Sequence, residues 1–193
     1  MCIKRQIIAT ADLLGLEKLE ILTILSELES VSGRFQYVIS EEGITAIIDY
    51  AHTPDALKNV LETINDIRTG NEKVITVIGC GGDRDVRKRP KMANIAAQLS
   101  NQAIFTSDNP RSENPQTILD EMEVGVAPEN YRKTLTVLDR RQAIKTACKL
   151  AETGDIILIA GKGHENYQEV NGVHSHFDDL EEVKNLFNQF KKN

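Results

Sequence analysis

A carboxylate, an amide and a guanidinium follow one another at the end of an apolar run. The quartet Asp108-Asn109-Pro110-Arg111 comes directly after residues 103–107, whose composition is typical of a buried strand. Pro110 fixes its own φ and restricts Asn109, so the polar groups are expected on a stiff turn. Two opposite charges on one turn suit a ligand that carries both an ammonium and a carboxylate group. Alone the quartet is a weak signal, because Asp-Asn-Pro also makes ordinary capped turns.

Two glycine-rich segments also follow apolar runs. Gly79-Cys80-Gly81-Gly82-Asp83-Arg84-Asp85 follows residues 74–78, and Gly161-Lys162-Gly163-His164-Glu165 follows residues 156–160. Glycines let backbone amides approach a ligand, and Arg84 offers a fork for a carboxylate or a phosphate. Neither segment has the spacing of a P-loop or of a dinucleotide fingerprint. Each also fits a plain connection, with Arg84 in a surface ion pair and His164 in a structural hydrogen bond.

A third segment, Asp49-Tyr50-Ala51-His52-Thr53-Pro54, has residues that could bind a nucleotide. Its carboxylate can hold ribose hydroxyls, and the ring of Tyr50 can stack on a base. The same residues also fit a capped helix start, with Thr53 as the cap and Pro54 in the first position. Arg34, in Ser32-Gly33-Arg34-Phe35, would ordinarily be a surface arginine.

The apolar pattern predicts the elements that would position these residues. It predicts strands at residues 35–39, 44–49, 74–78, 103–107, 135–138 and 156–160, a hairpin turn at Asn171-Gly172, and helices from Pro54, Pro90 and Pro115, after Asp139 and over residues 180–190. This alternation predicts an α/β fold, a Rossmann-like, mostly parallel sheet with helices on both faces. The polar loops should then meet at the carboxyl edge of that sheet. Leu and Ile at helical spacing over residues 7–28 predict a short helical segment before it.

Composition narrows the class of protein. The 193 residues suffice for one domain with an appendage or two small domains, and 40% apolar residues suffice for a core. A net charge of −6 argues against a nucleic-acid binder, and no apolar run is long enough to span a membrane. The cysteines Cys2, Cys80 and Cys148 lack C-x-x-C spacing, so we expect reduced thiols in a cytoplasmic protein rather than disulfides or a metal site.

Taken in order, these segments and Lys88-Arg89-Pro90 resemble the C-terminal domain of the Mur ligases. The resemblance covers residue 31 to about residue 187 and is greatest to members that add meso-diaminopimelate to UDP-N-acetylmuramoyl-L-alanyl-D-glutamate. It implies a remnant of the central ATPase domain at residues 1–30 and an amino-acid-binding domain at residues 31–193. For the full-length parent, it implies an amide-forming ligase of peptidoglycan precursor synthesis that uses ATP and Mg²⁺.

The resemblance also implies roles for individual residues. Diaminopimelate would contact Arg84, Asp108, Asn109, Pro110, Arg111, Gly161 and Glu165. Arg111 would grip the distal carboxylate, which lysine lacks, while Asp108 and Glu165 would face the distal ammonium group. The ATP side would hold Arg34, Asp49, Tyr50 and His52. No catalytic residue and no metal ligand is assigned within this chain.

The family pattern is incomplete in this sequence. It has no G-K-[ST] loop, none of the central domain's magnesium-binding residues and no UDP-binding domain. We therefore expect the chain alone to hold no ATP or Mg²⁺ and to be inactive, because phosphoryl transfer depends on groups positioned across a closed cleft. Two alternatives stay open: a family member for another amino acid, such as lysine or a glutamate polymer, and a non-catalytic binding fragment.

Overall fold

The computed structural model describes residues 33–190. The chain divides into two units, Met1–Val31 and Ser32–Asn193, and every described residue belongs to the second. The helical segment predicted over residues 7–28, and with it the proposed domain at residues 1–30, lies outside the described residues. Among the described residues, no helix has the length and apolar character needed to cross a membrane.

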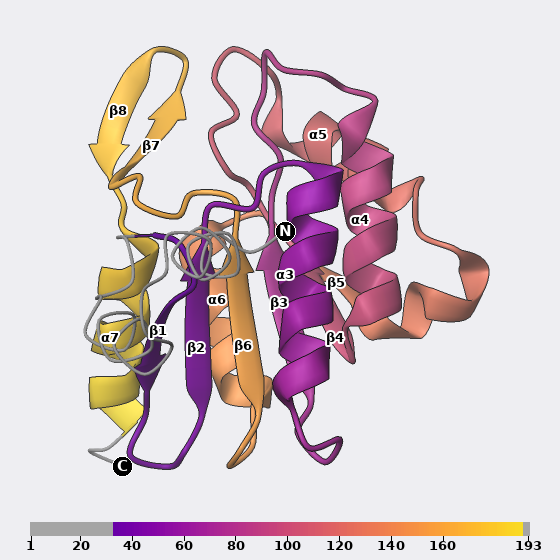
Figure 1. Cartoon of the computed structure of the whole chain (residues 1–193). Coiled ribbons are helices and arrows are strands. Elements are labelled where there is room, and N and C mark those ends of the chain that lie inside the picture. The colour runs from indigo at the N-terminus through magenta and orange to yellow at the C-terminus, as the bar shows by residue number, and fades with distance from the viewer. Residues whose placement is uncertain (1–32, 191–193) are drawn as a thin grey trace, which may run out of the picture. The chain divides into compact units, whose positions relative to one another are not determined.

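A six-stranded sheet forms the centre of the described unit (Figure 1). Its strands are β1 (Gln36–Ile39), β2 (Thr45–Asp49), β3 (Val74–Ile78), β4 (Gln102–Phe105), β5 (Thr134–Thr136) and β6 (Ile156–Ala160). They lie in the order β1-β2-β6-β3-β4-β5, and all neighbours are parallel except β1 and β2. Every residue of β3 and β6 is buried, as their continuous apolar runs predict for strands covered on both faces.

Helices cover both faces of the sheet, which confirms the predicted architecture (Figure 1). The helices α3 (Pro54–Ile67), α4 (Lys88–Leu99) and α5 (Pro115–Glu123) pack with one core, and α6 (Arg140–Leu150) and α7 (Asp179–Phe190) pack with the other. A 3₁₀ helix, Pro128–Lys133, precedes β5 and was not predicted. Each amphipathic helix therefore turns its apolar stripe toward the sheet.

The predicted starts of the helices are most accurate where a side chain caps the helix. Thr53 accepts a hydrogen bond from the backbone of α3, and Asp139 accepts one from α6. Helix α4 begins at Lys88, so the prediction of a start at Pro90 was two residues late. Proline is tolerated throughout the first turn of a helix, because the N–H groups of that turn have no partner within the helix. The position of a proline therefore predicts the first residue of a helix only to within a turn.

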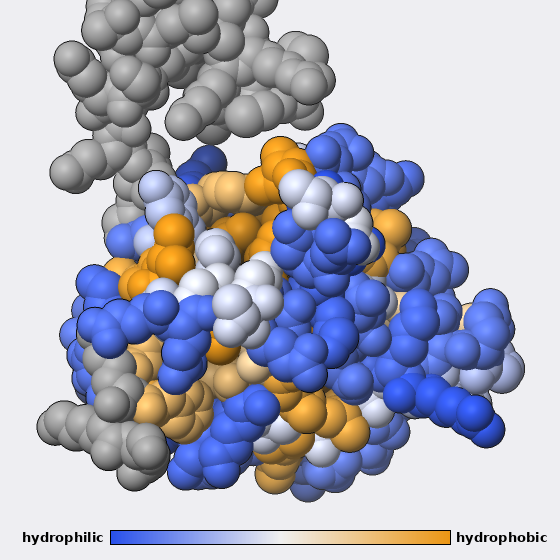
Figure 2. Space-filling model, turned by 90° about the horizontal axis from the view of Figure 1, so that it is seen from below, coloured by the Kyte–Doolittle hydropathy of each residue, from blue (hydrophilic) through white to orange (hydrophobic). Residues whose placement is uncertain are grey.

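A two-stranded hairpin follows the sheet near the C-terminal end of the chain. Strands β7 (Tyr167–Val170) and β8 (Val173–His176) are joined by Asn171 and Gly172, whose φ values are 50° and 76°. Two positive φ angles are typical of the predicted Asn-Gly hairpin turn. The hairpin projects from the edge at which β6 ends (Figure 1). Figure 2 shows the described surface from below, at the end away from the hairpin, where hydrophilic residues surround apolar ones.

Candidate functional site

The loops that follow β3, β4 and β6 meet at the carboxyl edge of the sheet, as predicted. The backbone N–H of Gly82 donates to the carbonyl of Asn109 across 2.9 Å. The side-chain amide of Asn109 in turn donates to Oε2 of Glu165 across 2.8 Å. We call this junction the rim: residues 79–85, 108–113 and 161–165.

Asn109 joins the loops of the rim. It is 2% exposed, and its Oδ1 accepts hydrogen bonds from Nζ of Lys162 and from the backbone N–H of Glu169, both at 3.0 Å. Its amide nitrogen is already used by Glu165. Asn109 therefore orients its neighbours, and little of its side chain is left for a ligand.

Lys162 lies beneath the rim rather than on its surface. Its Nζ is 3.7 Å from Oε2 of Glu165 and 5.5 Å from the ring centre of Tyr167. Burial lowers the pKa of Lys162, and nearby Arg140 lowers it further, while the carboxylates of Asp108 and Glu165 oppose both. The structure thus places Lys162 in the interior, at 0% exposure.

A buried ion pair that the sequence analysis missed supports the end of β6. Arg140 donates to Asp179 through Nε and through Nη2, both at 2.8 Å, and Nη2 also donates to the carbonyl of Ala160 at 3.1 Å. Nη1 is buried without a hydrogen-bond partner in the described part of the chain. Burial works to lower the pKa of Arg140, but the charge and hydrogen bonds of Asp179 outweigh it and raise that pKa.

Arg111, the expected carboxylate-binding residue, is already engaged within the chain. Its Nη1 donates to the carbonyl of Gly82 across 2.8 Å, and its Nε lies 3.2 Å from Oε2 of Glu169. Its backbone has a φ of 53°, a conformation that costs non-glycine residues about 1–3 kcal/mol and is found disproportionately at functional sites. A two-pronged grip on a ligand carboxylate would need one of these partners to move.

Arg84, in the loop after β3, is exposed, and among the described residues its guanidinium hydrogen-bonds only to the carbonyl of Asp83, at 3.3 Å. Asp83 is linked to the neighbouring loop, because its Oδ1 accepts from Oγ of Ser112 across 2.7 Å. That hydrogen bond, with one from the Ser112 backbone, lowers the pKa of Asp83. The structure thus brings the loops together without bringing the guanidinium of Arg84 into contact with Arg111 or Glu165.

Buried Arg89 anchors the loop after β3. Its guanidinium donates to Glu113 at 2.8 Å and to Glu121 at 2.6 Å, and it lies 3.4 Å from the carbonyl of Gly81. The hydrogen bond from Arg89 is the largest influence on Glu113 and lowers the pKa of that carboxyl. In the sequence, Arg89 was part of a segment that carries the family resemblance, but nothing there predicted that its side chain is buried.

On the expected ATP side, the carboxylate of Asp49 already accepts hydrogen bonds from backbone N–H groups. Its two carboxylate oxygens accept from the N–H groups of Phe35 and Ala51, each at 2.8 Å. Burial raises the pKa of Asp49 despite these hydrogen bonds, which lower it. Asp49 therefore closes the chain turn that carries Arg34, whose own side chain is exposed.

Tyr50 connects the expected ATP side to the rim. Its ring centre is 4.5 Å from that of His52 and 5.1 Å from that of His164. Burial raises the pKa of Tyr50, and the carboxylates of Glu165 and Asp108 add to the effect. The backbones of Gly33 and His164 also lie close together on this side, because a Cβ added to Gly33 would lie 2.0 Å from the backbone nitrogen of His164.

Comparison with known proteins now identifies the family. Residues 33–163 match the family described as "Mur ligase, glutamate ligase domain", which is more than half of the chain. The chain belongs to the Mur ligases. Over 184 residues it is 59% identical to a UDP-N-acetylmuramoyl-L-alanyl-D-glutamate--2,6-diaminopimelate ligase from Cytophaga hutchinsonii, covering 95% of this chain and 38% of that protein.

Further relatives carry the same description. The protein of that name from Bacteroides thetaiotaomicron is 55% identical over 94% of this chain and 38% of its own length. A solved structure of a ligase with this name superposes with a TM-score of 0.77 at 41% identity, covering 95% of this chain and 37% of that one. This Mur ligase chain thus spans about two fifths of the length of its relatives.

Neither the thiols nor the acidic residues in the described part of the Mur ligase domain form a metal-binding cluster. Cys80 and Cys148 are free and buried, and burial raises the pKa of each thiol to about 12, so both are unreactive at neutral pH. Within residues 33–190, no three His, Cys, Asp or Glu side chains gather in a way that could hold a metal ion.

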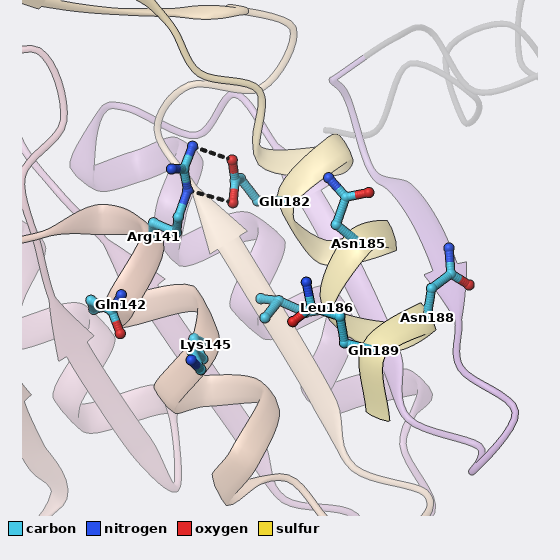
Figure 3. Close-up of a pocket in the computed structure, with 8 residues that line it drawn as sticks. All are labelled: Arg141, Gln142, Lys145, Glu182, Asn185, Leu186, Asn188 and Gln189. Atoms are coloured by element: carbon cyan, nitrogen blue, oxygen red, sulfur yellow. Dashed lines mark hydrogen bonds and ion pairs between the residues drawn. The ribbon is translucent and has the colours of Figure 1, made fainter. Parts of the chain in front are cut away.

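An open groove of 610 Å³ lies away from the rim, between α6 and α7 (Figure 3). Arg141 of α6 and Glu182 of α7 form a two-pronged ion pair at its end, with distances of 2.8 and 2.7 Å. The remaining lining is largely of amides and Lys145, and it includes none of the residues expected to bind a substrate. The candidate site of this Mur ligase domain therefore does not coincide with the groove between α6 and α7.

Proposed function

We propose that this chain is the C-terminal, amino-acid-binding domain of a ligase that joins meso-diaminopimelate to UDP-N-acetylmuramoyl-L-alanyl-D-glutamate. The single observation that carries the proposal is the 2.8 Å contact between Asn109 and Glu165, since it unites two segments expected to hold the amino acid. The names of the 59% and 55% identical relatives support the same substrate. Because those proteins are much longer, activity belongs to a full-length parent, and we expect this chain alone to be inactive.

The charges of the rim suit the two ends of the substrate. Asp108, 8% exposed, and Glu165 offer carboxylates to the distal ammonium group. Arg111 and exposed Arg84 offer guanidinium groups to the distal carboxylate. Gly161 lets Asp108 approach the loop after β6 closely, because a Cβ at this position would lie 2.6 Å from Oδ2 of Asp108. Pro110 holds the intervening turn stiff.

In the assembled parent, ATP would bind on the side of Tyr50 that faces away from the rim. When bound, it supplies the phosphoryl group that activates the carboxylate of the UDP-linked dipeptide. The exposed side chains of Arg34 and His52 fit polyphosphate and base contacts, and Nζ of Lys88 adds a cation 2.9 Å from the carbonyl of His52. We propose that other parts of the parent hold the Mg²⁺ ion that accompanies ATP. We further propose that the reaction takes place in the cytoplasm, and the free thiols of Cys80 and Cys148 support this.

Titration of the isotopically labelled 193-residue chain with meso-diaminopimelate and with L-lysine, followed by NMR, tests the proposal. We expect the chain to prefer diaminopimelate and Arg111→Ala to lose that preference. Lysine lacks the distal carboxylate that Arg111 would bind, and losing that charge-assisted contact should cost about 1–3 kcal/mol, because Arg111 keeps its partners Gly82 and Glu169. Arg132→Ala, which removes an exposed arginine elsewhere, serves as the control. Equal binding of lysine, or an Arg111→Ala chain with an unchanged preference, would overturn the assignment.

A further inference from the structure

Glu169 of the hairpin faces the guanidinium of Arg111. Oε2 of Glu169 lies 3.2 Å from Nε of Arg111, and the two side chains are 23% and 19% exposed. The residue belongs to β7, outside every segment that the sequence analysis assigned to the site. A carboxylate of this chain therefore stands where a ligand carboxylate is expected.

Arg111 does not depend on that carboxylate for its position. Its backbone N–H donates to the carbonyl of Glu169 across 3.1 Å, and its carbonyl accepts from the N–H of Asn171 across 2.7 Å. The side chain is held separately, because Nη1 donates to the carbonyl of Gly82 across 2.8 Å. Removing the carboxylate of Glu169 would leave all three contacts in place.

A carboxylate that binds an arginine with both oxygens needs two adjacent N–H groups. One such edge of Arg111 includes Nε, beside Glu169, and the other includes Nη1, beside the carbonyl of Gly82. Gly82 is fixed by its own N–H bond to Asn109, whereas the side chain of Glu169 can rotate. Glu169 is thus the partner that an incoming carboxylate displaces.

We propose that Glu169 is an internal competitor for Arg111 and so sets how strongly the site prefers an amino acid with a distal carboxylate. This inference rests on the proposed function, in which Arg111 binds that carboxylate. The displaced side chain has a second partner available, since Nε2 of His174 is 3.7 Å from Oε2 of Glu169. Glu169 acts through Arg111 and is a specificity-determining residue rather than a catalytic one.

Glu169→Gln tests the competition, because it keeps the shape of the side chain and removes its charge. NMR titrations of the 193-residue chain give the dissociation constants of meso-diaminopimelate and L-lysine, and their ratio is the readout. We expect the variant to raise the preference for diaminopimelate by about twofold to fivefold, the gain that follows from removing a partly exposed ion pair. Affinity for lysine should hardly change.

Glu181→Gln is the matched control. Glu181 pairs with His176 at 2.7 Å, so this variant removes one negative charge near the hairpin without touching Arg111. Its preference should equal that of the unmodified chain. Glu169→Ala provides a second deletion of the carboxylate and must move the preference in the same direction as Glu169→Gln. Far-UV circular dichroism verifies that each variant is folded.

The outcomes separate this inference from the proposed function. If Arg111→Ala abolishes the preference for diaminopimelate while Glu169→Gln leaves it unchanged or weaker, the competitor role is wrong and the proposed function stands. If Arg111→Ala leaves the preference intact, or no chain binds diaminopimelate, the proposed function fails and this inference fails with it. A rise in Glu181→Gln equal to that in Glu169→Gln would also overturn the inference, because it would indicate a general charge effect.

Discussion

Arg140 and Asp179 face each other with two parallel hydrogen bonds of 2.8 Å, and neither side chain is exposed. The pair joins the first residue of α6 to the first residue of α7, and Nη2 of Arg140 extends it to the last residue of β6. It therefore connects the helices behind the sheet to the strand end from which the rim begins.

Removing one member of this pair should destabilise the fold. We expect Arg140→Met or Asp179→Leu alone to lower the free energy of unfolding by about 3–5 kcal/mol, because each leaves a buried charge without its partner. The double variant should lose less than either single one. Urea denaturation measures all three.

The exposed pair between Arg141 and Glu182 is the control (Figure 3). Arg141→Ala should cost about 0–1 kcal/mol, since the arginine side chain is 55% exposed. Equal losses for Arg140→Met and Arg141→Ala, or a double variant that is worse than both singles, would show that burial of the first pair has no energetic role.

Asn109→Ala should loosen the rim and destabilise the chain. The substitution removes the hydrogen bonds to Glu165 and Lys162 and leaves a buried ammonium group with fewer partners. We expect a loss of about 1–3 kcal/mol in the free energy of unfolding. Asn188→Ala, at an exposed position of α7, should stay within about 0.5 kcal/mol of the unmodified chain. If both variants melt at the same temperature, Asn109 does not join the loops as described.

Gly161→Ala should be more damaging than its backbone conformation alone predicts. Gly161 has a φ of 115° and Gly70 a φ of 100°, so alanine is strained at both positions, by about 1–2 kcal/mol. Only at Gly161 would the new Cβ meet an atom, Oδ2 of Asp108 at 2.6 Å, whereas the space around Gly70 is open. Thermal unfolding of the two variants should therefore differ, and similar melting temperatures would refute the close approach.

Alkaline pH should weaken the fold through its buried thiols. Burial raises the pKa of Cys148 from an ordinary 9.0 to about 12, so between these values the unfolded chain ionises while the folded chain keeps its proton. The folded state then binds more protons, and stability falls as pH rises, by about 1.4 kcal/mol per thiol at pH 10.

Cys148→Ala tests this dependence. Urea denaturation at pH 7.5 and pH 10 gives the loss of stability for each chain, and the loss in the variant should be smaller by about 1.4 kcal/mol. Comparing the change with pH, rather than the stability itself, removes the cost of the smaller side chain. Identical pH dependence in the two chains would contradict a buried, neutral thiol at this position.

Local sequence patterns predicted most of the fold. The bounds of β3 and β6 are those of their apolar runs, and Asp139 marks the start of α6, because these features depend on neighbours in the chain. The start of α4 was misplaced, since Pro90 fits more than one position of a first turn. The 3₁₀ helix before β5 has no periodic pattern from which it could be predicted.

For the site, the predictable part was where the loops meet, because parallel strands place their carboxyl ends at one edge. Burial of individual charged residues could not be predicted. Arg140 follows a helix cap and reads as a surface position, while its partner Asp179 is 39 residues away. Glu169 likewise sits in a strand with no motif, and its contact with Arg111 depends on how the hairpin returns to the sheet. The roles of individual residues toward diaminopimelate and ATP stay predictions.

The place of β6 in the sheet bears on how the chain acquires its structure during synthesis. This strand emerges from the ribosome late, yet it lies between β2 and β3, which emerge early. Until residue 160 has been synthesised, strands β1-β2 and strands β3-β4-β5 can form only two separate sheets with unpaired edges. Such exposed edges favour aggregation, and the late long-range pairing slows folding. A nascent chain stalled before β6 should therefore recruit chaperones, whereas one released after α7 should not.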